Sequence, residues 1–179
     1  MDEIVKYMAE DEWKDDKKAE RKSYLFKLAK KSKTQKDISH KIGGMLIYNQ
    51  VIEEFLKDIV EYSVNYIKAE IWPAKVYMKF DFSKATFGSL INLFKQYATI
   101  EYNREIIIRY LTKYKEIRNQ VVHNLFNIED LQKLSLELDE YALIADEIIY
   151  LLIEYDNSIC VKFCDLAERV DFKKIQGEI

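Results

Sequence analysis

The sequence contains few residues that interrupt helices: it has four glycines and one proline, Pro73, in 179 residues. Long segments therefore run without a helix breaker, as a helical bundle requires and a many-stranded sheet does not. It also has only two cysteines, Cys160 and Cys164. Their number and spacing do not fit a zinc site, so we expect two small buried hydrophobic residues in a reducing cytosol. Neither a metal nor a cofactor is predicted.

Long apolar runs are missing as well. The N-terminus is acidic and lacks an apolar stretch, so it does not resemble a signal peptide. The most apolar run, 142–153, contains Asp146 and Glu147 and is too short to span a bilayer. We therefore expect a soluble cytoplasmic protein with no membrane partner.

Charge is close to balanced, with a net value of −3, but it is unevenly distributed. Residues 17–41 contain ten Lys or Arg and two acids, whereas residues 128–157 contain nine acids and one lysine. A basic region of this kind suits a polyanion, and solvated helix faces of both signs are an equal alternative. For an RNA partner, we expect non-specific phosphate contacts from Lys33, Lys36 and Lys41.

Helical periodicity is what the sequence does contain. Apolar residues three and four apart predict a long helix from Ile38 to about Trp72, capped by Thr34 or Asp37. Gly43 and Gly44 near its start predict a close helix crossing or a kink.

The middle of the chain is less regular. The alternation in 76–82 predicts an extended connector, which can pair with its copy in a dimer. Ser83 or Thr86 then opens a short helix, and Asn103 starts a longer one. The apolar positions of that longer helix are Ile107, Tyr110, Leu111, Tyr114, Ile117, Val121 and Leu125.

A heptad pattern follows, with Asn127 expected as the cap of its helix. The positions of the pattern are Leu131, Leu134, Leu138, Tyr141, Ala145, Ile148 and Leu152. The sequence therefore predicts one all-α domain, 1–179, built as an up-and-down bundle of four to five main helices at 38–155. A charged N-terminal helix, 1–37, and a C-terminal helix or tail, 156–179, flank it.

The candidate site is the segment Arg118-Asn119-Gln-Val-Val-His123. Asn119 and His123 are four apart and share a helix face, so the amide can orient the imidazole. Arg118 lies about 140° around the helix from His123. Two copies related by a two-fold axis can bring these groups to one cleft, which one copy cannot.

The residue types fit RNA cleavage by the RNA's own 2′-hydroxyl. That reaction needs a base, an acid and positive charge at the phosphorane. Histidine titrates near neutrality and arginine holds phosphate oxygens in a fork. A homodimer supplies two copies of His123 and of Arg118, a sufficient set without a metal.

The stretch Tyr114–Phe126 resembles the signature of the HEPN superfamily, in which an arginine, usually a polar residue, and a histidine follow in that order. Thr86–Phe94 is similar to small bacterial members, and the resemblance covers about 38–155. It implies a bundle that dimerises through the motif helices and, in active members, a metal-independent endoribonuclease in which Arg118 stabilises the phosphate, Asn119 orients the site and His123 acts as acid or base.

The resemblance also implies a role as a toxin or antiphage (abortive-infection) effector, with an antitoxin or regulatory protein as a possible partner. In HEPN toxins paired with nucleotidyltransferase antitoxins, a tyrosine two positions after the histidine is modified. Leu125 stands there, so neutralisation by that route is not expected.

Two alternatives remain open. The heptad seam and the acidic region suit a non-catalytic interaction module of the same fold, and the motif can instead hold a free nucleotide or RNA phosphate. The carboxylate pairs Glu53–Glu54 and Asp146–Glu147 are expected on helix surfaces. His40 is expected to be solvated or a local hydrogen-bond partner.

Overall fold

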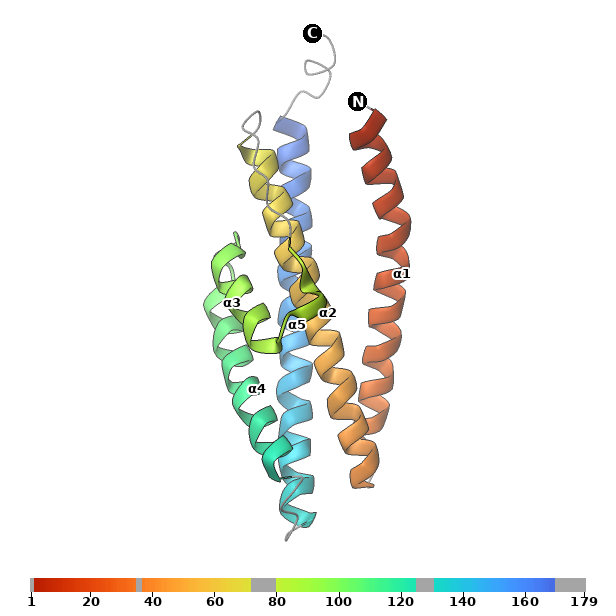
Figure 1. Cartoon of the computed structure of the whole chain (residues 1–179), viewed down its shortest axis with the longest axis vertical. Helices are drawn as coiled ribbons and strands as arrows, with labels where there is room; N and C mark the ends of the chain where they lie inside the picture. The colour runs from red at the N-terminus through yellow and green to blue at the C-terminus, as the bar shows by residue number, and fades with distance from the viewer. Residues whose placement is uncertain (1, 35–36, 72–79, 125–130, 170–179) are drawn as a thin grey trace.

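A computed structural model of the chain describes residues 2–34, 37–71, 80–124 and 131–169. Its α-helices are α1 (Asp2–Lys33), α2 (Ile38–Glu70), α3 (Phe87–Tyr97), α4 (Arg104–Asn124) and α5 (Leu131–Arg169). Within these ranges there is no strand, so the predicted all-α bundle is confirmed. Figure 1 shows α1, α2 and α5 as long rods, with the shorter α3 and α4 on the side away from α1. Among the described helices, none has a stretch long and apolar enough to cross a membrane.

Local side-chain chemistry sets the helix starts. Asp37 caps α2, because its carboxylate accepts a hydrogen bond of 2.7 Å from the backbone N–H of Ser39. That bond also lowers the pKa of the Asp37 carboxyl. Thr86 caps α3, because its hydroxyl oxygen accepts a hydrogen bond of 3.2 Å from the backbone N–H of Ser89. Asn103, at φ 58°, precedes α4, a backbone conformation that asparagine tolerates better than most residues.

The heptad seam of α5 is internal packing. Its buried members are Leu134, Leu138, Tyr141, Ala145, Ile148 and Leu152. They pack in one core with the buried stripes of α2, α3 and α4. Only Leu131, at the start of the seam, is exposed, at 56%. The seam therefore holds the bundle together and is not a free surface for a partner.

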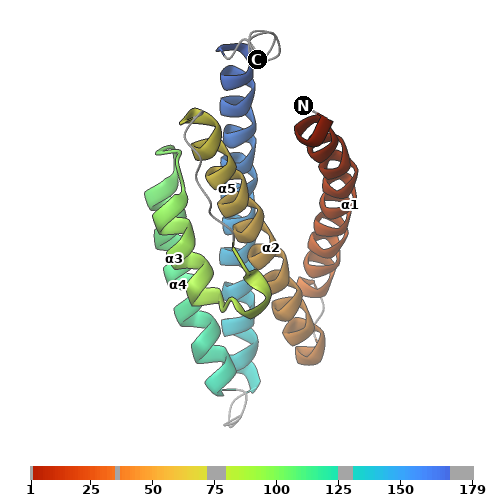
Figure 2. The same cartoon turned by 45° about the horizontal axis from the view of Figure 1, so that its top comes forward.

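The glycine pair near the start of α2 marks where α1 crosses it. A Cβ on Gly44 would lie 2.9 Å from Cβ of Ser32 on α1, whereas one on Gly43 would meet nothing within 4 Å. The predicted close crossing therefore depends on Gly44. Beyond the crossing, α1 diverges from the other helices toward its N-terminus, as Figure 2 shows.

Several expectations about the ends and connections need correction. The predicted C-terminal helix is not separate, because α5 runs without a break for 39 residues and contains no glycine or proline to end it sooner. Cys160 and Cys164 are exposed, so the prediction of buried cysteines was wrong. Of the predicted connector, 76–82, residues 76–79 lie outside the described ranges, and Phe82 begins a 3-10 helix, Phe82–Lys84. The predicted Asn127 cap also lies outside them.

Candidate functional site

Arg118 lies on the buried stripe of α4. It follows Tyr114 by one helical turn and Leu111 by two, and both of these are fully buried. Its own side chain is half-buried, whereas Asn119 and His123 are exposed. The structure therefore turns the arginine toward the bundle and the other two residues toward solvent. No hydrogen bond joins Asn119 to His123 in the part of the chain that the structure describes.

The guanidinium of Arg118 sits beside an aromatic ring and has an unused donor. Its central carbon is 5.8 Å from the ring centroid of Phe87 on α3. Its Nε is buried and has no hydrogen-bond acceptor among the described residues. A buried donor without an acceptor costs free energy. This donor is therefore suited to an acceptor brought by a ligand.

Glu53, on α2, is a source of negative charge that acts on Arg118. It is half-buried, and burial raises the pKa of its carboxyl, while the positive charges of Lys57 and Arg118 act to lower it. No ion pair joins Glu53 and Arg118 among the described residues, so their attraction acts through space. Glu53 therefore lies on a helix face that neighbouring residues partly cover. Nothing in the sequence links it to Arg118, because only helix packing brings their charges within range of each other.

A buried tyrosine pair fixes the interior beside Arg118. The Tyr141 hydroxyl on α5 donates a hydrogen bond of 2.8 Å to Oδ1 of Asn49 on α2. It shares a second hydrogen bond with the Tyr114 hydroxyl on α4. The two rings lie with centroids 4.4 Å apart. Burial raises the pKa of both tyrosines, and the positive charge of Arg118 opposes that effect. Sequence periodicity placed both tyrosines in the core but did not reveal this polar link between three helices.

Two of the three lysines expected to contact RNA form ion pairs within the bundle. Lys33 lies 2.8 Å from Asp146 on α5, and Lys41 lies 2.7 Å from Asp139 on the same helix. Lys36 is outside the described residues. Asp146 also accepts a hydrogen bond of 2.7 Å from the Tyr48 hydroxyl, and its side chain is largely buried. The prediction that Asp146 lies on a helix surface was therefore wrong. The basic and acidic regions of the sequence thus neutralise each other in part.

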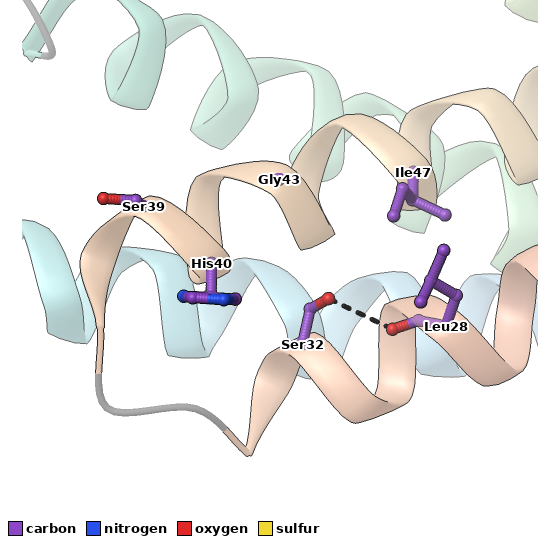
Figure 3. Close-up of a pocket in the computed structure, with 6 residues that line it drawn as sticks. All are labelled: Leu28, Ser32, Ser39, His40, Gly43 and Ile47. Atoms are coloured by element: carbon purple, nitrogen blue, oxygen red, sulfur yellow. Dashed lines mark hydrogen bonds between the residues drawn. The ribbon is translucent and has the colours of Figure 1, made fainter.

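His40 is exposed at the start of α2, with Nδ1 3.5 Å from a carboxylate oxygen of Asp37. This agrees with the local role expected for it. It borders a shallow hollow of about 270 Å³ between α1 and α2, which Figure 3 shows. The other residues around the hollow are Leu28, Ser32, Ser39, Gly43 and Ile47. The hollow includes none of the three predicted catalytic residues.

Among the residues with described positions, no three His, Cys, Asp or Glu are grouped closely enough to hold a metal ion. Comparison of the chain with protein-family models, with characterised proteins and with solved structures found no match. What the site can do therefore has to be argued from its own residues. They comprise an inward-facing cation with a free donor, a half-buried carboxylate whose charge it feels, and a solvent-facing imidazole little more than one helical turn away.

Proposed function

We propose that the protein is a metal-independent endoribonuclease of the HEPN type, with Arg118 and His123 of two copies forming one composite site. The observation that supports it most is the pairing, on the last turns of α4, of an exposed His123 with an Arg118 whose Nε is buried and unpartnered. A titratable imidazole and a donor awaiting an anion are the groups that phosphodiester cleavage requires.

In the proposed reaction, His123 of one copy removes the proton from the RNA 2′-hydroxyl. The 2′-oxygen forms a bond to phosphorus, and the bond from phosphorus to the 5′-oxygen breaks. His123 of the second copy gives its proton to the departing 5′-oxygen. The products are a 2′,3′-cyclic phosphate and a 5′-hydroxyl. Arg118 stabilises the negative charge that develops on the phosphorane oxygens.

Before RNA binds, the carboxylate of Glu53 supplies part of the charge that balances Arg118. A phosphate that enters the site takes over this task and meets the free Nε donor. Tyr114 and Tyr141 fix the helices around the arginine before substrate binds.

The proposed homodimer follows from the geometry of a single copy. Arg118 and His123 point about 140° apart around α4, so one copy does not focus them on one phosphate. The outward side of the bundle offers apolar residues for an isologous contact: Val122 is 38% exposed, Leu136 70% and Leu143 57%. A contact through Val122 brings two copies of α4 together, whereas Leu136 and Leu143 lie on α5. The biological role we infer is that of a toxin or antiphage effector.

The same surface supports a second candidate, a non-catalytic module that binds a partner protein. Leu136 and Leu143 are seven residues apart on the outward face of α5, and Glu140 and Glu147 accompany them. A basic, apolar partner helix matches that face. In this case Arg118 and His123 need no substrate.

One assay separates the two candidates. Purified protein is incubated with end-labelled single-stranded RNA in excess EDTA, and the product ends are analysed, with sedimentation at the same concentrations. We expect cleavage, 2′,3′-cyclic phosphate ends and a dimer. The composite ribonuclease is contradicted if the RNA stays uncleaved, if cleavage requires added Mg²⁺, or if the protein is a monomer at all concentrations. Uncleaved RNA together with a tightly co-purifying protein favours the interaction module.

A further inference from the structure

The second half of α1 presents a positively charged face to solvent. Arg21, Lys27 and Lys31 are exposed, and Tyr24, 64% exposed, lies at the centre of the arc that they span. Within the described part of the chain, none of these three cations has an ion pair or a hydrogen bond. Glu20 is the only acid in residues 17–33. We call these four residues, Arg21, Tyr24, Lys27 and Lys31, the α1 basic face.

The lysines on the opposite side of α1 are matched by partners. Nζ of Lys22 lies 2.9 Å from a carboxylate oxygen of Asp58, and Lys33 forms an ion pair with Asp146. Lys30 donates a hydrogen bond of 2.7 Å to the Tyr150 hydroxyl. The bundle therefore neutralises Lys22 and Lys33 with carboxylates, gives Lys30 a hydroxyl acceptor, and leaves the outward cations available. This division explains why the positive charge of the α1 basic face survives in a chain whose net charge is negative.

We propose that the α1 basic face binds the backbone of single-stranded RNA, with Tyr24 stacking against a base. The cations spread over ten residues of helix, which is about 15 Å. A basic track with an aromatic side chain in its centre suits a flexible strand, because the cations follow phosphates and the ring accepts any base. The inference rests on the proposed function for its choice of RNA as ligand.

An anionic membrane is the other ligand that a basic helix can bind, but the packing of α1 disfavours it. A helix that lies in a membrane surface needs a free apolar face. The apolar residues Leu25, Phe26 and Ala29 of α1 pack against the core. Among the residues of α1 whose burial the structure describes, 17–33, the large apolar side chains exposed to solvent are Tyr24, at 64%, and Leu28, at 37%.

The α1 basic face also lies toward the end of the bundle that carries the motif. Figure 1 shows the C-terminal end of α1 and the C-terminal end of α4 at the same end of the molecule. The ion pair of Lys41 with Asp139 joins the start of α2 to the start of α5 at that end. Because α2 and α5 lie between α1 and α4, an RNA strand held by α1 reaches His123 by passing around this end of the bundle.

The test measures binding without cleavage. Fluorescent single-stranded RNA is titrated by anisotropy with the full chain carrying His123→Ala, in EDTA, at 50 to 200 mM salt. The double variant Lys27→Gln/Lys31→Gln is compared with the double variant Lys84→Gln/Lys95→Gln. Lys84 and Lys95 are exposed and lie outside α1, so the second variant removes the same amount of charge elsewhere. We expect the α1 pair to weaken binding at least tenfold and to reduce the salt slope by about 1.4, and the control pair to change Kd less than twofold.

Tyr24 gives an independent readout. Tyr24→Ala is expected to weaken RNA binding about tenfold and Tyr24→Phe to leave it unchanged, because stacking needs only the ring. Equal effects of the two lysine pairs, no RNA binding at 50 mM salt, or tighter binding to phosphatidylserine vesicles than to RNA overturns the proposal. RNA binding through α1 by a chain that never cleaves RNA would instead refute the proposed nuclease alone, so the two failures are distinguishable.

Discussion

The hydroxyl of Tyr141 on α5 donates a hydrogen bond of 2.8 Å to Oδ1 of Asn49 on α2. Because it shares another hydrogen bond with Tyr114 on α4, three helices meet at one buried polar point. Arg118 lies one turn beyond Tyr114 on α4. The candidate site thus lies next to a buried polar cluster, and the rigidity of that cluster helps to fix the position of the arginine.

Tyr141→Phe tests this cluster. The substitution leaves Asn49 and Tyr114 buried without their partner, so the free energy of unfolding should fall by about 1–3 kcal/mol. Urea denaturation measures the change. Tyr24→Phe removes a solvent-exposed hydroxyl and should leave stability within about 0.5 kcal/mol of wild type. Equal stability of the two variants would mean that the cluster does not hold the helices together.

The two neighbouring glycines of α2 should respond to alanine in opposite ways. Gly44→Ala places a methyl group against Ser32 of α1 and should destabilise by about 1–3 kcal/mol. Gly43→Ala meets open space and should stabilise the helix by about 0.5–1 kcal/mol. Thermal unfolding of both variants measures the difference. A stabilising Gly44→Ala is incompatible with the close crossing of α1 and α2.

Asp58→Asn should release α1 from the bundle. Asp58 is 4% exposed and accepts a hydrogen bond from the ammonium group of Lys22. The Lys22 side chain is itself largely buried, and its Nζ lies 4.2 Å from the Phe55 ring centroid. Removal of the carboxylate leaves a buried unpaired cation and should cost about 3 kcal/mol, with faster hydrogen exchange in residues 17–33. Glu105→Gln breaks an exposed pair with Arg104 and should cost at most about 0.5 kcal/mol. Unchanged exchange in α1 after Asp58→Asn contradicts this mode of docking.

Glu53→Gln should change how stability depends on pH. Burial raises the folded-state pKa of Glu53, so its ionised form is less favourable in the folded chain than in the unfolded one. Its favourable contribution is present at low pH and is lost as pH rises through the raised pKa. The unfolding free energy of wild type should therefore fall relative to that of Glu53→Gln between about pH 4 and pH 7. Glu54→Gln is the neighbouring control, and a difference of the opposite sign rules out the burial effect.

Sequence periodicity was enough to predict the helices that frame the site. The stripes of α2, α4 and α5 repeat every three to four residues, and the caps Asp37 and Thr86 stand directly before their helices. These features are local, so the chain carries them in a readable form. The length of α5 was underestimated because the apolar pattern weakens after Leu152 although the helix continues.

Pairings across the bundle could not be predicted in the same way. Lys33 and Asp146 are 113 positions apart, and only the packing of α1 against α2 and α5 brings them together. Charge blocks indicated a basic and an acidic region but not that the two meet. The same holds for Glu53 and Arg118, which share a site although no spacing in the sequence connects them.

The most direct test of the central claim compares the two histidines in one cleavage assay. His123→Ala and His40→Ala each remove an exposed imidazole, one from the motif on α4 and one from the start of α2. In EDTA with single-stranded RNA, we predict that His123→Ala lowers the cleavage rate by about 10²–10⁴ and that His40→Ala stays within twofold of wild type. Cleavage by His123→Ala at the wild-type rate would contradict the account.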